Sequence, residues 1–298
     1  MFHYEDCFYI DNSSIDVLLN LDPYIVVGTA AGKIQLRNLM NPQKIIAELP
    51  DNQLPLACLA SHNNFLFIAR STAWIEVWHL DPLRMVAEFR TQAGYPNTMA
   101  ISSDFTVIGG EGRIEVLESK TKNSLGFLRS LEQKTDLQVE KIFINNHKLY
   151  ANVYGDLVRV WNLATLKEEF SLAQEPSIST FSLIEGFLLI ATDHCVETGD
   201  DFCTLNIWNL SPLECIARLG KNEDDFIFDL KVRRSMYSSQ PYIVAATSEK
   251  IDLWEWETWK HLQTIGDLNT FNCFELINDT LYIGDINGRV QIYKQAIE

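Results

Sequence analysis

One short segment of the chain gathers every residue type that commonly binds a metal ion. Between positions 193 and 203 lie His194, two cysteines (Cys195 and Cys203) and four carboxylates. Imidazole, thiolate and carboxylate groups are ligands for zinc and other divalent ions. Their spacing matches no recognised metal-binding motif, and Cys203 is expected to begin a strand. We therefore predict neither a metal site nor a cofactor, and keep a metal ion bound by this segment as an alternative.

The same segment predicts an acidic surface. A second acidic stretch, GKNEDDF, follows at 220–226 with Lys221 as its only basic residue. If the two stretches lie on one rim, their carboxylates attract a basic partner and accelerate its encounter. The alternative is that they are solvated loops that keep the protein soluble. The candidate partner-binding carboxylates are Asp193, Glu197, Asp200, Asp201, Glu223, Asp224 and Asp225.

Two aromatic residues are further candidates for binding a partner. Trp74 is expected in a turn, and Tyr95 in a link (QAGYPN) on the same face as the acidic stretches. Because Trp and Tyr are enriched among the residues that dominate binding energy at protein interfaces, we predict that both anchor a partner.

No pattern of catalytic residues stands out. The Ser-x-Asp-x-Gly-x-Thr-Trp box of sialidase-like enzymes does not occur, and the six histidines fall mostly in predicted turns. We predict a protein that is not an enzyme. A hydrolase or lyase with its site in a central channel is a remote alternative.

Composition narrows the classes of partner and location. The net charge of −16 disfavours nucleic acid, whose phosphates require a concentrated positive surface. No apolar run approaches the roughly 18–20 residues that cross a bilayer, and the N-terminal residues do not resemble a secretory signal. The six scattered cysteines indicate no disulfide framework. We expect a cytoplasmic protein without membrane insertion.

A repeat organises the whole chain. Seven segments alternate apolar and polar residues and end at a position that is usually Trp, which we call the Trp position. This alternation is typical of a strand with two different faces. The Trp positions recur with a period of about 43, which indicates a ring of β-sheets. They are Arg37, Trp78, Leu117, Trp161, Trp208, Trp254 and Tyr293.

Each repeat contains four predicted strands, so the sequence predicts an all-β fold with seven four-stranded antiparallel blades, a seven-bladed β-propeller. The last repeat ends without its outer strand, and the N-terminal segment at about 2–10 has no other assignment. We predict that it completes the last blade. The repeats leave no linker, so residues 1–298 are expected to form one domain, monomeric within a complex.

One repeat departs from this period. Ala191 lies 17 residues before Trp208, whereas the corresponding residues Gly28, Ala69, Ala245 and Gly284 lie nine before theirs. Blade five therefore has an insertion of about eight residues, which predicts an enlarged turn between its second and third strands.

The phrases VWHL (77–80), VWNL (160–163) and IWNL (207–210), each followed by a turn and a strand, resemble the WD40 repeat family along essentially the whole chain. The chain departs from that family's pattern because it has no Gly-His pair, and only Glu111-Gly112 and Asn287-Gly288 stay close to the usual Asp-Gly turn. The resemblance implies a propeller that acts as a protein-interaction scaffold. Its phrasing also resembles substrate-recognition propellers of ubiquitin-ligase-type complexes, which is the alternative function.

Overall fold

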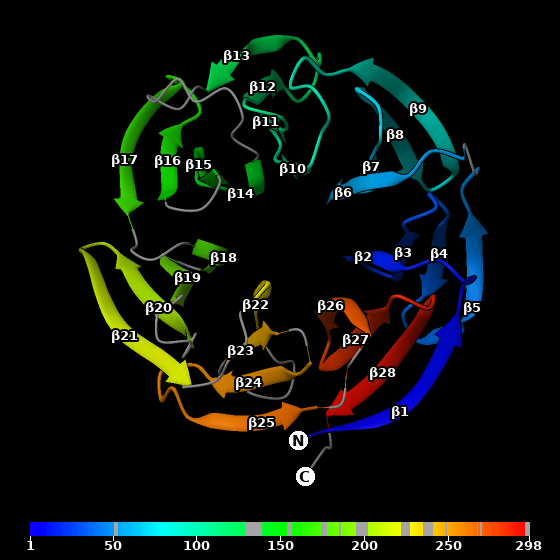
Figure 1. Ribbon diagram of the computed structural model, residues 1–298. Helices are drawn as coiled ribbons and strands as arrows, with labels where there is room; N and C mark the ends of the chain where they lie inside the picture. The colour runs from blue at the N-terminus through cyan, green and yellow to red at the C-terminus, as the bar shows by residue number, and fades with distance from the viewer. Residues whose placement is uncertain are drawn as a thin grey trace. The chain divides into compact units, whose positions relative to one another are not determined.

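Every regular element in the described part of the chain is a β-strand. The computed structural model describes residues 1–50, 53–128, 139–153, 157–173, 178–184, 186–194, 202–221, 227–234, 241–247, 249–266, 268 and 270–295. Its 28 strands form seven four-stranded antiparallel sheets (Figure 1). The predicted seven-bladed β-propeller is confirmed.

The chain divides into two compact units, which are described separately. The first unit comprises residues 1–29, 35–48 and 175–298, and the second comprises residues 30–34 and 49–174. In every blade built from four consecutive strands, the strands follow one another across the sheet in chain order.

Blades two to four belong to the second unit. Their strands are β6 (Leu56–His62), β7 (Phe65–Arg70), β8 (Trp74–Leu80) and β9 (Leu83–Arg90); β10 (Thr98–Ile101), β11 (Phe105–Gly109), β12 (Ile114–Glu118) and β13 (Ser124–Leu128); and β14 (Val139–Asn145), β15 (Lys148–Val153), β16 (Leu157–Asn162) and β17 (Lys167–Ala173).

The first unit holds the remaining blades. Blade one has β2 (Ile15–Leu21), β3 (Tyr24–Thr29), β4 (Ile34–Asn38) and β5 (Asn41–Glu48), and blade five has β18 (Ile178–Ile184), β19 (Phe187–His194), β20 (Phe202–Leu210) and β21 (Leu213–Lys221). Blade six has β22 (Asp229–Arg234), β23 (Pro241–Ala246), β24 (Ile251–Glu255) and β25 (His261–Ile265), and blade seven has β26 (Phe271–Ile277), β27 (Thr280–Asp285), β28 (Arg289–Gln295) and β1 (Phe2–Tyr9).

The core lies between neighbouring blades. In the second unit, Ile75 and Val77 of β8 pack with Met99 and Ile108 of blade three. In the first unit, a Cβ added to Gly284 would lie 2.6 Å from Ile15 Cγ2 of blade one. Apolar side chains therefore fill the space between sheets that approach too closely for a larger residue at some positions.

The N-terminal strand completes blade seven, as predicted. β1 pairs antiparallel with β28, from Phe2 opposite Gln295 to Tyr9 opposite Arg289 (Figure 1). Two glutamines from flanking blades hold its other edge. The Gln263 side chain accepts from the Phe2 backbone N–H (2.6 Å) and donates to the Phe2 carbonyl (2.7 Å), and the Gln43 side chain donates to the Cys7 carbonyl (2.9 Å).

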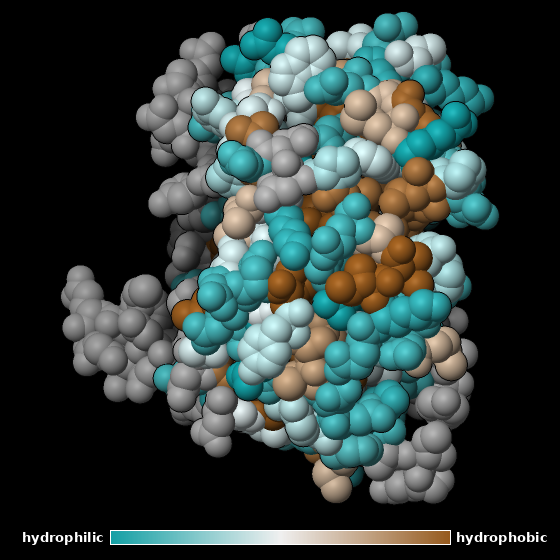
Figure 2. Space-filling model, turned by 90° about the vertical axis from the view of Figure 1, so that its right-hand side faces the viewer, coloured by the Kyte–Doolittle hydropathy of each residue, from teal (hydrophilic) through white to brown (hydrophobic). Residues whose placement is uncertain are grey.

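The outer strand β5 mixes apolar and polar side chains on its exposed surface. Ile45 and Ile46 are 44% and 40% exposed, and Gln43 and Lys44 beside them are also exposed. β5 lies at the right of Figure 1 and therefore faces the viewer in Figure 2, where brown side chains lie among teal ones. Charged residues on an edge strand disfavour pairing with another chain.

Part of the insertion in blade five lengthens the hairpin of β19 and β20. Asp193 pairs with Cys203 and His194 pairs with Phe202, so that part of the insertion continues the ladder between β19 and β20. Cys203 also pairs with Lys221 of β21. The described residues contain no helix that is long and apolar enough to cross a membrane.

Candidate functional site

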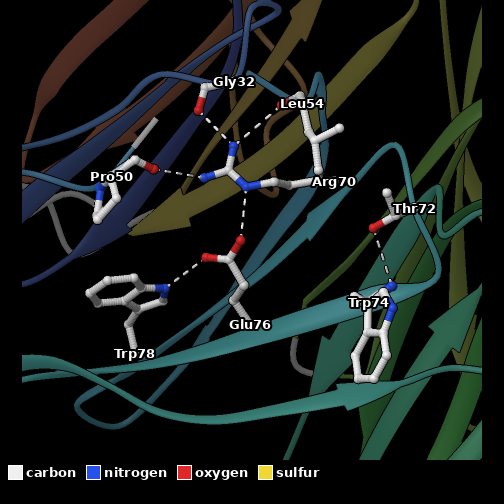
Figure 3. Close-up of polar contacts among 8 residues, drawn as sticks. All are labelled: Gly32, Pro50, Leu54, Arg70, Thr72, Trp74, Glu76 and Trp78. Atoms are coloured by element: carbon white, nitrogen blue, oxygen red, sulfur yellow. Dashed lines mark hydrogen bonds and ion pairs between the residues drawn. The ribbon is translucent and has the colours of Figure 1, made fainter. Parts of the chain in front are cut away.

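Trp74 is an exposed aromatic residue at one end of blade two. It was predicted in a turn but is the first residue of β8, and it is 47% exposed. Its backbone N–H donates to Thr72 Oγ1 at 3.3 Å (Figure 3). Trp74 therefore directly follows the turn at 71–73 that joins β7 to β8.

The guanidinium group of Arg70 fixes the start of that turn. It donates from Nη1 to the carbonyls of Gly32 (2.8 Å) and Leu54 (3.3 Å) and from Nη2 to that of Pro50 (3.4 Å). Figure 3 shows these groups converging on the Arg70 side chain, which is 3% exposed. A single buried cation therefore binds three backbone carbonyls of the second unit, one in the turn at Gly32 and two on the link between β5 and β6.

A buried carboxylate completes this network. Glu76 Oε1 accepts from Arg70 Nε at 2.9 Å, and Glu76 Oε2 accepts from the indole N–H of Trp78 at 2.9 Å (Figure 3). The indole N–H of Trp78, at the Trp position of blade two, thus donates to a side chain of its own blade. Trp74 has no such role and presents its ring to solvent.

Tyr95 is the second exposed aromatic residue, and it lies on the link between β9 and β10. It is 56% exposed, whereas the neighbouring residues Thr91, Ala93 and Pro96 are buried. The buried carboxylate of Glu115, from β12, accepts hydrogen bonds from Thr91 Oγ1 (2.6 Å) and from the Gln92 backbone N–H (2.7 Å). The start of the link, at Thr91 and Gln92, is therefore fixed by hydrogen bonds to a buried side chain of blade three.

Close backbone packing fixes the same link from the side of blade three. A Cβ on Gly110 would lie 2.4 Å from the Ala93 oxygen and 2.7 Å from the Tyr95 oxygen, so only glycine fits there. The Asn97 N–H donates to the Gly109 carbonyl at 2.8 Å. Tyr95 therefore projects from a link whose backbone is fixed on both sides of it.

One hydrogen bond joins the two aromatic segments. The Thr91 N–H donates to the Ala73 carbonyl at 2.8 Å, which connects the base of the Tyr95 link to the residue before Trp74. Four residues of chain span at most about 14 Å, so Tyr95 lies within that distance of Thr91. We call the end of blades two and three that carries Trp74 and Tyr95 the aromatic rim.

The predicted acidic residues lie mostly outside the described residues. Glu197, Asp200, Asp201, Glu223, Asp224 and Asp225 all fall in that category. Asp193, on β19, is described. It is half-buried and lies opposite Cys203 of β20. The strands that lead into both acidic stretches are neighbours, because Cys203 pairs with Asp193 on one side and with Lys221 on the other.

Most of the candidate metal ligands in the 193–203 segment lie outside the described residues, so a metal ion bound there stays an untested alternative. Burial raises the pKa of the Cys203 thiol to about 12. Within the described ranges, no three His, Cys, Asp or Glu side chains gather as a metal site requires.

Buried polar residues recur in the third strand of every blade, a feature that the sequence analysis missed. The residue two positions before each Trp position is polar and no more than 9% exposed. In blade six, for example, Asp252 Oδ1 is 2.9 Å from His261 Nε2 and also accepts a hydrogen bond from Thr264 Oγ1. The sequence signal for this feature is the polar residue that stands two positions before the Trp position in each alternating segment. The seven residues are Gln35, Glu76, Glu115, Arg159, Asn206, Asp252 and Gln291.

Comparison with known proteins supports the fold alone. No family model and no curated protein sequence matches the chain. Among solved structures, the chain is similar to the computationally designed protein Ika8, with 14% sequence identity and a TM-score of 0.70, over 95% of this chain and 97% of that one. The resemblance to WD40 repeats stays a prediction.

Proposed function

We propose that the protein is a non-enzymatic scaffold that binds a protein or peptide partner at the aromatic rim, within a complex in the cytoplasm. The observation that carries the proposal is the pairing of exposure with rigidity. Trp74 and Tyr95 are 47% and 56% exposed, yet the backbone that bears them is fixed by buried groups. Because an ordered surface loses little conformational freedom on binding, exposed aromatic residues on a fixed backbone favour tight association.

The chemistry beneath the rim supports binding rather than catalysis. The two buried carboxylates there, Glu76 and Glu115, accept hydrogen bonds from Arg70, from Trp78 and from the link backbone. Both are oriented inward, where they hold the protein's own backbone and side chains. They are therefore placed to support a binding surface and not to exchange protons with a substrate.

The proposal is tested with the double variant Trp74→Ala/Tyr95→Ala. Immobilised wild type and variant are used to capture proteins from a cell extract, and the captured proteins are quantified by mass spectrometry. If Trp74 and Tyr95 dominate the binding energy, their truncation should lower the affinity for a true partner at least about thirtyfold.

The matched control is Met85→Ala/Val86→Ala, because these two apolar side chains of β9 are similarly exposed, at 50% and 43%, in the same unit. Partners retained by the control and lost by the rim variant support the proposal. Equal capture by all three proteins contradicts it.

A further inference from the structure

The aromatic rim also carries two exposed arginines that form no ion pair with a carboxylate in the described part of the chain. Arg90 ends β9 and lies directly opposite Trp74 in the ladder, with the two Cα atoms about 4.5–5.5 Å apart. Directly opposite residues in antiparallel strands project from the same face of the sheet. Arg90 and Trp74 therefore form one exposed cationic and aromatic pair.

Arg113, just before β12, contacts the Tyr95 link at Gln92. Its Nη1 lies 3.5 Å from the Gln92 carbonyl, and its guanidinium carbon lies 5.8 Å from the centre of the Phe127 ring. The side chain is exposed. These weak contacts orient the guanidinium group beside the link and leave its other N–H groups free to donate.

Neither arginine forms an ion pair with any described residue. This is unusual in a chain with 40 acidic and 24 basic residues, where carboxylates are in excess. Two carboxylates beneath the rim have other functions: Glu115 is buried beneath the link, and Glu76 pairs with Arg70. Two exposed acidic residues lie here: Glu111, which lies against Gly94, and Glu88, two residues before Arg90 on the same face of β9.

Resting on the proposed function, we infer that the partner segment is acidic: an extended peptide stretch with carboxylates beside an apolar side chain. The apolar group would contact Trp74 or Tyr95. The carboxylates would accept paired hydrogen bonds from Arg90 and Arg113, whose planar groups match carboxylate geometry. The rim would thus select an acidic segment although the whole protein carries a net charge of −16.

The test is an unbiased selection of random twelve-residue peptides displayed on phage against the immobilised full chain. Enriched peptides are synthesised, and their affinities are measured by fluorescence anisotropy for the wild type and for Arg90→Glu/Arg113→Glu. The matched control is Arg84→Glu/Lys120→Glu, which makes the same change in net charge at exposed positions of the same unit.

We expect peptides rich in Asp and Glu that bind the rim variant at least tenfold more weakly than the control, with affinity that falls as salt is raised. Acidic peptides that bind both variants equally overturn the inference. Basic or neutral peptides whose binding is lost in Trp74→Ala/Tyr95→Ala overturn the acidic partner and leave the proposed function standing. Failure to enrich any peptide counts against both.

Discussion

At the scale of single residues, buried polar groups hold the exposed ones in place. Arg70 and Glu76 position the segments around Trp74, and Glu115 positions the link that carries Tyr95. None of these three side chains needs to touch a partner. Their contribution is to remove backbone freedom before binding, which lowers the entropic cost of association.

The Arg70 network can be tested directly. Replacing Arg70 with Met removes the donor to three carbonyls and leaves the Glu76 carboxylate, 11% exposed, without its cation. Because an unpaired buried charge is costly, we expect the free energy of unfolding to fall by about 3–5 kcal/mol in urea denaturation. The exposed Arg84→Met serves as control and should change stability by no more than about 0.5 kcal/mol. Equal effects of the two substitutions would show that the network does not stabilise the fold.

The sequence predicted part of this site. Trp74 and Tyr95 were identified because they were expected in a turn and a link on one face, and Trp and Tyr are enriched at protein interfaces. Arg90 and Arg113 were missed, since a lone arginine at or next to the end of a strand looks like any surface charge. Glu76 and Glu115 were missed for the opposite reason: polar residues in an alternating strand suggest solvent, but here both faces of the strand are covered by neighbouring groups.

At the scale of elements, the N-terminal strand is the best example of a prediction from pattern. The missing outer strand of the last repeat and the unassigned segment at about 2–10 together predicted β1, which the structure places at Phe2–Tyr9. The glutamines that hold its outer edge were not predictable, because glutamine at 43 or 263 carries no distinctive local signal.

We predict that the Gln263 side chain holds the N-terminal strand β1 in place. Its side-chain amide bonds to both the N–H and the carbonyl of Phe2, as a neighbouring strand would. We expect Gln263→Ala to lower the free energy of unfolding by about 1–2 kcal/mol, because two partly buried hydrogen bonds are lost. Hydrogen exchange at the β1 amides should accelerate as well. Gln92→Ala, at an exposed side chain, is the control. Unchanged hydrogen exchange at the β1 amides in Gln263→Ala would show that Gln263 does not hold this strand in place.

The blade-five insertion shows where pattern reasoning loses detail. Its length predicted an enlarged turn, which lies outside the described residues, and it did not predict that Asp193 and His194 continue the β19 ladder. Backbone pairing does not depend on side-chain alternation, and polar residues can extend a hairpin when the strands before them already set the register. The acidic surface proposed for this region stays a prediction.

At the scale of the whole molecule, the net charge of the chain and the charges exposed at the aromatic rim favour different kinds of partner. A net charge of −16 alone favours a basic partner through long-range attraction. The aromatic rim instead exposes two arginines, Arg90 and Arg113, beside two glutamates, Glu88 and Glu111, so its described residues do not share the acidic excess of the chain. Long-range steering decays within about 10 Å at 0.1 M salt, so contacts at the rim determine affinity once the partner arrives.

Hydroxyl-radical footprinting of the protein with a captured partner tests the central claim most directly. Oxidation of Trp74 and Tyr95 is followed by mass spectrometry in the free and bound states, with Leu213 and Ile216 of β21, 45% and 42% exposed, as internal references. We predict that binding strongly protects Trp74 and Tyr95 and leaves the references unchanged. Unaltered oxidation of both aromatic residues in a saturated complex would contradict the assignment of the aromatic rim as the binding surface.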